Sequence, residues 1–232
     1  TNSTLSGNTA KNGGGIRNSG ASANLNISNS TLSGNSATNS GGGIASAGTL
    51  TVTNSTISGN TSSFSGGGIA SAGNLTVTNS TLSGNTASNG GGIFNNSGDT
   101  LNIANTIIAN STDGASTPAA IDDYSGGGTV NLIVSGNVND PTTLANNIVT
   151  LDTNTNTLTN TSSWATVVTS AALNLGPLQN NGGPTDTIAL TASTPLSVRT
   201  GGNATISNAA PINALDQRGI ARSSTAPSIG AY

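Results

Sequence analysis

The heptapeptide Asn54-Ser55-Thr56-Ile57-Ser58-Gly59-Asn60 recurs along the first half of the chain and decides its fold. Further copies, with leucine in place of isoleucine, begin at residues 2, 29 and 79, and a degenerate copy begins at residue 105. Each full copy is followed by a Gly-Gly-Gly-Ile segment, at residues 13–16, 41–44, 66–69 and 90–93. A repeat of about 25 residues is typical of a solenoid, in which each turn covers the next.

Within one repeat, the apolar residues show where the strands lie. Leu50-Thr51-Val52-Thr53 alternates apolar and polar side chains, which indicates a half-buried strand. Ile57 is the inward side chain of a second strand, and Ile69 is the inward side chain of a third. A polar connection joins the second strand to the third. The sequence therefore predicts an all-β fold, a right-handed parallel β-helix (β-solenoid) with three short strands per turn and about seven to nine turns.

The repeats predict columns of identical side chains along the solenoid axis. The inward aliphatic columns contain Leu32, Ile57 and Leu82, and Ile44, Ile69 and Ile93. Two asparagine columns contain Asn29, Asn54, Asn79 and Asn105, and Asn35, Asn60 and Asn85. Stacked amides can hydrogen-bond from turn to turn, because each carries donors and an acceptor. The Asn-Ser-Thr tripeptides also match the N-glycosylation pattern, but we favour the ladder because the match follows the structural period.

The glycine triplets have two interpretations. Glycine-rich loops can bind phosphate when a helix follows them, and no helical period follows here. We therefore expect the triplets to serve tight turns or close backbone packing.

Composition excludes several classes of function. The 232 residues include no Cys, Met or His, so thiol and imidazole chemistry are absent. A net charge of −3 without a basic cluster makes nucleic acid a poor partner. No apolar run approaches the ~20 residues of a membrane span, and we predict no cofactor and no metal site. The chain opens within a repeat and lacks a start Met and a signal sequence, so we interpret it as a mature or trimmed product.

The later part of the chain is less regular. We divide the sequence into regular turns (1–138), irregular turns with longer loops (139–174) and a C-terminal module (175–232). The module contains Leu175–Thr185, with Gln-Asn-Asn-Gly-Gly-Pro at its centre, then Asp216-Gln217-Arg218-Gly219 and Ile229-Gly230-Ala231-Tyr232.

These motifs, together with the repeats, resemble bacterial surface proteins that carry polymorphic outer-membrane-protein-like repeats and a C-terminal choice-of-anchor Q module. The resemblance implies an extracellular or cell-surface location, with no established catalytic residues to carry over. We expect the module, from about Leu175, to form the final turns of the solenoid. The segment Thr194–Gly201 departs from the family pattern, since it lacks the expected Asp, and no acidic residue follows the last aromatic one.

Catalysis is not predicted. Polysaccharide-cleaving β-helices need clustered carboxylates, and residues 1–98 contain no acid. Asp122 and Asp123 are adjacent and are interpreted, with Asp113 and Asp140, as solvated loop acids. We expect Asp216 and Arg218 to form a local ion pair.

Two non-catalytic functions remain open. The first is a structural or adhesin-like surface protein that assembles head-to-tail with copies of itself into a filament. The second is a glycan-binding or ice-binding solenoid, in which outward hydroxyl residues form a flat binding face. That candidate face consists of Thr31, Ser33, Thr56, Ser58, Thr81 and Ser83. A polysaccharide-active enzyme is the less favoured alternative.

Overall fold

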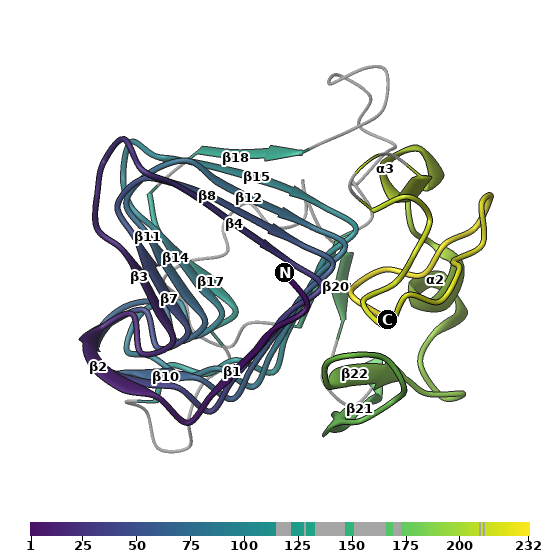
Figure 1. Ribbon diagram of the computed structural model, residues 1–232, viewed down its shortest axis with the longest axis horizontal. Helices are drawn as coiled ribbons and strands as arrows, with labels where there is room; N and C mark the ends of the chain where they lie inside the picture. The colour runs from purple at the N-terminus through teal and green to yellow at the C-terminus, as the bar shows by residue number, and fades with distance from the viewer. Residues whose placement is uncertain are drawn as a thin grey trace.

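The computed structural model describes residues 1–114, 122–127, 129–132, 147–150, 166–168, 173–208, 210 and 212–232. The first part of the chain is a β-solenoid of about 4 turns, built from stacked parallel sheets (Figure 1). In Figure 1 the chain runs clockwise as it recedes from the viewer, so the coil is right-handed. The fold class predicted from the repeats is confirmed.

Four parallel sheets form the walls of the coil, and we name them A to D in the order in which the chain enters them. Sheet A contains β1 (Thr4–Ser6), β5 (Thr31–Ser33), β9 (Thr56–Ser58), β13 (Thr81–Ser83), β16 (Ile107–Ala109), β19 (Ile148–Thr150) and β20 (Thr166–Val168). Sheet B contains β2 (Thr9–Asn12), β6 (Ser36–Ser40) and β10 (Thr61–Ser62). Sheet C contains β3 (Ile16–Asn18), β7 (Ile44–Ser46), β11 (Ile69–Ser71), β14 (Ile93–Asn95) and β17 (Tyr124–Ser125). Sheet D contains β4 (Asn24–Ser28), β8 (Thr49–Thr53), β12 (Leu75–Thr78), β15 (Thr100–Ala104) and β18 (Thr129–Leu132).

Sheet B is a fourth wall that the sequence does not predict. Its strands lie in the segment that we expect to be a polar connection between the second and third strands. The inward residue there is small, as in Ala37, which pairs with Ala10 in the turn before and Ser62 in the turn after. Because no large aliphatic side chain marks this wall, the alternation of the sequence gives little sign of a strand.

Left-handed backbone positions turn the chain from one wall to the next. In the third turn Asn54, Gly59 and Gly66 have φ values of 53°, 64° and 64°. Asparagine tolerates this conformation better than other residues with a Cβ atom. The same corner is occupied by Asn2, Asn29, Asn79 and Asn105, all with positive φ. The asparagine of the repeat is therefore first of all a corner residue.

The core consists of aliphatic columns that run along the axis. On sheet A, Leu32 pairs in register with Leu5 and Ile57, and Ile57 pairs with Leu82. On sheet C, Ile69 pairs with Ile44 and Ile93. All six predicted ladder residues are fully buried. Sheet D adds two further columns, which are Leu25, Leu50, Leu75, Leu101 and Val130, and Ile27, Val52, Val77 and Ile103.

The C-terminal module does not form the final turns of the solenoid. It contains the antiparallel pair β21 (Leu175–Gln179) and β22 (Thr187–Leu190) and two short helices, α2 (Leu196–Thr200) and α3 (Ala204–Asn208). Figure 1 shows all four elements beside the coil, next to sheet A. The predicted position at the end of the stack is therefore wrong, and the predicted seven to nine turns included residues that fold alongside.

The segment 139–174 contributes β19 and β20, which continue sheet A. Most of that segment, including Trp164, lies outside the described residues, so its predicted irregular turns stay a prediction. In the part of the chain that the structure describes, no helix is long and apolar enough to cross a membrane.

We expect a Tyr124→Phe variant to lose less stability than the natural protein when the pH rises above 10. Tyr124 follows Ile93 in the sheet C column, and burial raises the pKa of its phenol above 10.0, while the neighbouring side chain of Asn95 lowers that pKa by less. The phenol of the unfolded chain ionises first, so this contribution is present below pH 10 and is lost as pH rises through the folded pKa. Urea midpoints from about pH 8 to pH 11 test it, and parallel curves for both proteins would contradict it.

Candidate functional site

The outer face of sheet A, which the sequence offers as a binding face, is covered by the chain itself. Thr31 and Thr56 have no solvent exposure and Thr81 has 1%. The hydroxyl of Thr31 donates to the carbonyl of Asp186 at 2.5 Å, and the hydroxyl of Thr81 accepts from the backbone N–H of Ala231 at 3.1 Å. We call Thr31, Thr56 and Thr81 the Thr rank. The expectation that the Thr rank faces solvent is therefore wrong. Of the serine rank, Ser83 is buried, while Ser33 and Ser58 are half-buried.

We name residues 175–232 the C-terminal clamp, because its side chains bridge successive turns of the coil. Gln217 is the central contact, with 1% exposure. Its amide nitrogen donates to the hydroxyls of Thr31 and Thr185, both at 2.8 Å, and its amide oxygen accepts from Thr56 at 2.7 Å. A single side chain thus joins the second and third turns through their outward threonines.

Arg222 is a buried cation at the same interface. Its guanidinium donates to the side-chain oxygen of Asn54 at 3.1 Å and to the carbonyl of Gly230 at 2.6 Å. Burial lowers its pKa from the usual arginine value to about 10, and the charge of Asp216 opposes that change. Arg222 therefore remains protonated at neutral pH. Because the folded pKa is lowered, the contribution of Arg222 to the free energy of unfolding rises with pH from about pH 10 up to the higher pKa of the unfolded side chain. This contribution is the same in the Tyr124→Phe variant and in the natural protein, so it cancels when the two are compared.

Apolar contacts continue the interface at the next turns. Ile107 and Ala109 stand on the outer face of β16 where earlier turns have Thr and Ser, and they pack with Leu173, Val198 and Ile229. A strand that is apolar on both faces indicates cover on both sides. The degenerate repeat Asn105-Thr106-Ile107-Ile108-Ala109 contains this signal, because its outward positions are Ile and Ala instead of Thr and Ser.

The two asparagine columns behave differently. In the column at the end of sheet A, the side-chain nitrogens of Asn8, Asn35 and Asn60 each donate to the next oxygen, of Asn35, Asn60 and Asn85, at 2.9, 2.9 and 3.0 Å. The other column is split into two bonded pairs, Asn29 with Asn54 and Asn79 with Asn105, at 2.9 and 3.3 Å.

Clamp residues occupy the break in that second column. Arg222 takes the oxygen of Asn54, and the nitrogen of Asn79 donates to the hydroxyl of Ser207 at 2.9 Å. Asn54 and Asn79 are buried. Their amides are therefore engaged by the folded chain, which favours the ladder interpretation over glycosylation.

We expect Gln217→Ala to destabilise the clamp by about 1–3 kcal/mol, because the buried hydroxyls of Thr31, Thr56 and Thr185 each lose one hydrogen bond. Hydrogen exchange of residues 175–232 should become faster, while exchange in sheets C and D should change little. Gln179→Ala is the matched control, since Gln179 is exposed and its side chain bonds, among the described residues, only to the nearby Asn181. Equal exchange in both variants would mean that Gln217 does not hold the clamp.

The acidic residues have structural partners. Asp122 and Asp123 are buried, at 1% and 0% exposure, so their interpretation as solvated loop acids is wrong. The carboxylate of Asp122 accepts from the N–H of Gly90 at 2.7 Å, and that of Asp123 from the N–H of Ser111 at 2.8 Å. The predicted ion pair of Asp216 with Arg218 is confirmed at 2.5 Å. Asp113 is also buried, and Asp140 lies outside the described residues.

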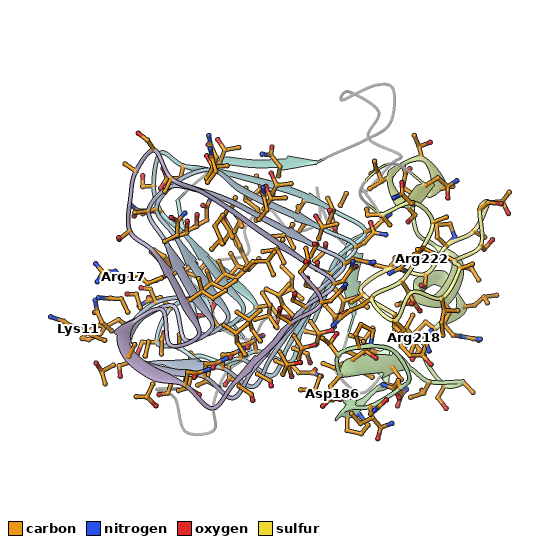
Figure 2. All side chains as sticks on the ribbon, in the orientation of Figure 1. Lys11, Arg17, Asp186, Arg218 and Arg222 are labelled. Carbon is orange, nitrogen blue, oxygen red and sulfur yellow. The ribbon has the colours of Figure 1, made fainter. Side chains whose placement is uncertain are left out.

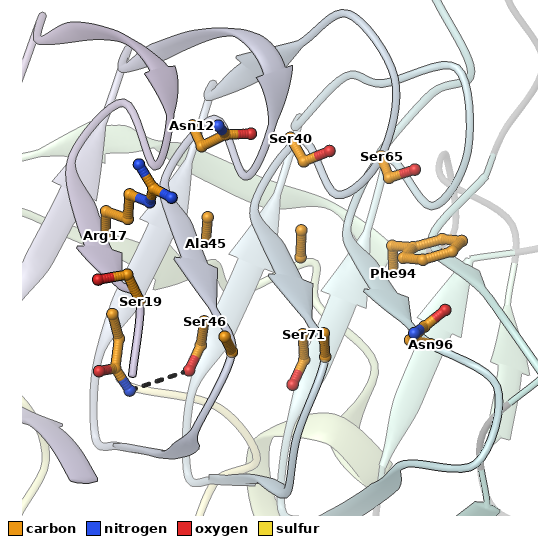
Figure 3. A pocket seen from close by; sticks show the side chains of 14 residues that line it. Asn12, Arg17, Ser19, Ser40, Ala45, Ser46, Ser65, Ser71, Phe94 and Asn96 are labelled. Atoms are coloured by element: carbon orange, nitrogen blue, oxygen red, sulfur yellow. Dashed lines mark hydrogen bonds between the residues drawn. The ribbon is translucent and has the colours of Figure 1, made fainter. Parts of the chain in front are cut away.

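An open groove runs along the outer face of sheet C, on a different side of the coil from the clamp. Its floor is the in-register row Arg17, Ala45, Ala70 and Phe94. Figure 3 shows Arg17 at one end, Phe94 at the other, and a row of polar side chains on each side. The polar rows are Asn12, Ser40 and Ser65, and Ser19, Ser46, Ser71 and Asn96. The volume of this sheet C groove is about 300 Å³.

Comparison of the chain with protein-family models, with curated proteins and with solved structures finds no match. The resemblance of residues 175–232 to a choice-of-anchor Q module therefore depends on the quoted motifs alone. Within this structure those motifs belong to the clamp. Gln217 of the Asp-Gln-Arg-Gly segment binds the Thr rank, and Gly230 of the terminal segment donates to the carbonyl of Asn105 at 2.8 Å.

Proposed function

We propose that this chain is a non-catalytic structural protein of the cell surface or the extracellular space, in which the coil is a rigid support for further contacts. The observation that carries the proposal is that the repeated polar side chains and the buried carboxylates are hydrogen-bonded to other parts of the same fold. The amide ladder, the Thr rank and the carboxylates of Asp122, Asp123 and Asp216 are all bound within the fold. Groups held in this way support the backbone of neighbouring turns and are poorly placed to act on a substrate.

The clamp supports the same proposal. It bonds to Thr31, Thr56, Thr81 and Asn105, which belong to four successive turns. A lateral brace of this kind opposes separation of the turns, since each turn of a solenoid is otherwise held only by its neighbours. Rigidity along the axis suits a protein that has to project from a surface.

The proposal is tested in the natural host cells and with the purified protein. Antibody labelling of intact cells should reach the protein, and incubation with a panel of acidic polysaccharides should release neither reducing ends nor unsaturated sugars. Labelling only after the cells are opened would contradict the location. Product release that is lost in an Asp122→Asn, Asp123→Asn double variant would contradict the absence of catalysis.

Head-to-tail assembly into filaments stays a prediction, which electron microscopy of the purified protein over a range of concentrations would test. A glycan-binding or ice-binding function would require a face of the coil other than the outer face of sheet A. The Thr rank of sheet A is bound to the clamp, so a flat ice-binding or glycan-binding array is not offered there, whereas the sheet C groove is open.

A further inference from the structure

We propose that the sheet C groove binds a linear acidic glycan, such as a uronic acid oligosaccharide, laid along the solenoid axis. The inference goes beyond the structural role proposed above and does not depend on it. It is argued from the charges beside the groove, from the aromatic ring at its end, and from the spacing of its rims.

The charges beside the groove call for an anionic partner. Lys11 and Arg17 are the only charged side chains in residues 1–98, and both lie in the first turn. Figure 2 shows them projecting from the same side of the coil. The only ion pair among the described residues is that of Arg218 with Asp216, far from this side, and no carboxylate lines the groove. A carboxylate on the ligand would supply the missing counter-charge.

The floor of the groove suits the apolar face of a sugar ring. Phe94 is half-buried and lies three turns from Arg17, with the methyl groups of Ala45 and Ala70 between them. An aromatic ring offers a flat apolar surface on which the C–H face of a sugar can stack. Both alanines keep the floor low, so that a ring can approach the sheet while the larger end residues hold the chain of sugars in place.

The rims suit the hydroxyls of the sugars. One rim is formed by the half-buried side chains of Asn12, Ser40 and Ser65, one to a turn, and such groups both donate and accept hydrogen bonds. On the other side only the end residues Ser19 and Asn96 are exposed, because the buried hydroxyls of Ser46 and Ser71 donate to the carbonyls of Gly48 and Gly73 at 3.0 and 2.9 Å. Successive turns are about 4.8 Å apart, close to the length of one residue in an extended β-linked hexose chain. The rim of Asn12, Ser40 and Ser65 can thus present one polar side chain to each sugar in turn.

An extended peptide fits this groove less well. Its residues advance by about 3.3 Å, so its side chains fall out of step with the turns. Addition of a peptide strand to sheet C is blocked as well, since the inner strands of that sheet already have neighbours on both sides.

The test measures binding of a uronic acid tetrasaccharide to the purified full chain by calorimetry. Arg17→Gln and Phe94→Ala should each weaken binding by about tenfold, the former because a charge-assisted hydrogen bond is lost. The carboxyl-reduced, neutral tetrasaccharide should bind more weakly and should not respond to Arg17→Gln. Alanine already occupies the position of Phe94 in the two preceding turns, so the Phe94→Ala variant is expected to fold.

Two matched controls separate the groove from general effects. Arg199→Gln removes an exposed cation of the clamp, and Phe64→Ala removes a ring that is 59% exposed outside the groove; neither should change the affinity. The proposal is overturned if the tetrasaccharide does not bind at millimolar concentration, or if binding is unchanged in both groove variants. Tighter binding of a poly-glutamate peptide with the same dependence on Arg17 would equally overturn it, in favour of an acidic protein partner.

Discussion

Gly67→Ala is expected to destabilise the solenoid by about 4 kcal/mol or more, which would place it among the most damaging single substitutions. Gly67 is the middle glycine of its triplet, and its backbone N–H donates to the carbonyl of Gly90 in the next turn at 3.3 Å. A Cβ atom at Gly67 would lie 2.5 Å from the carbonyl oxygen of Gly91 and 2.5 Å from both the nitrogen and the oxygen of Thr86. All three contacts are with backbone atoms, so relief requires that two turns move apart.

Gly59→Ala provides the control, because it adds the same methyl group at a corner of the same turn. There φ is +64° and the nearest atom to a Cβ would be the nitrogen of Gly34 at 4.0 Å. Only the left-handed strain is expected, about 1–2 kcal/mol. Urea denaturation followed by circular dichroism compares the two variants. A loss in Gly67→Ala that is no larger than the loss in Gly59→Ala would show that the turns are not packed as closely as the structure has them.

The glycine triplet is one of the features of the fold that can be predicted from the repeat in the sequence. The repeat period gave the solenoid, the stacked aliphatic columns and close packing at the triplets, because each of these follows from identical residues lying above one another. Sheet B was missed, since Ala37 is too small to mark an inward face. Local alternation registers a strand only when the inward side chain is large enough to stand out against Ser and Thr.

The position of the clamp against sheet A cannot be predicted from the repeat, and the physical reason is a different one. The repeat describes what each turn does for its neighbours, whereas the cover of sheet A comes from residues more than a hundred positions away, as in the contact of Gln217 with Thr31. The available signal was the change from Thr81 and Ser83 to Ile107 and Ala109 on the outer face. That change says that something covers the strand, but it does not say what.

The burial of Asp122 and Asp123 cannot be predicted from the sequence for a related reason. Adjacent aspartates in a polar insertion are usually solvated, and nothing in their spacing requires burial. In the structure Asp122 and Asp123 lie beside the turn where the regular repeats end, and their carboxylates take up backbone N–H groups of Gly90 and Ser111. The sheet C groove cannot be predicted from the sequence either. Its floor has Arg, Ala and Phe at one position of the repeat, so no repeated residue type marks it.

Asn60→Asp is expected to cost about 3–5 kcal/mol at neutral pH, although it changes one NH₂ group to an oxygen. Asn60 is fully buried in the continuous ladder. Its side-chain nitrogen donates to the carbonyl of Leu32 and to the amide oxygen of Asn85, both at 3.0 Å. Its oxygen accepts from the backbone and side-chain nitrogens of Asn35, at 3.0 and 2.9 Å. An aspartate keeps the second pair of bonds but turns the first pair into contacts between oxygens.

The same substitution should make stability depend on pH in a defined direction. Burial and two facing oxygens favour the protonated carboxyl, which can still donate one hydrogen bond, so the folded pKa of the introduced aspartate should lie above the unfolded value of about 3.9. The deficit relative to the natural protein is then smallest near pH 4, and it grows as pH rises through the folded pKa. Urea denaturation at a series of pH values measures this difference directly.

Two further variants separate charge from loss of the amide. Asn60→Leu should also destabilise the coil, because the partners of the amide lose their bonds, but its deficit should not change with pH. Asn74→Asp is the exposed control, which should stay within about 0.5 kcal/mol of the natural protein. If Asn60→Asp matched Asn74→Asp, the ladder would contribute little. A ladder that stabilises the coil requires that each amide both accept and donate, and the aspartate removes only the donating half.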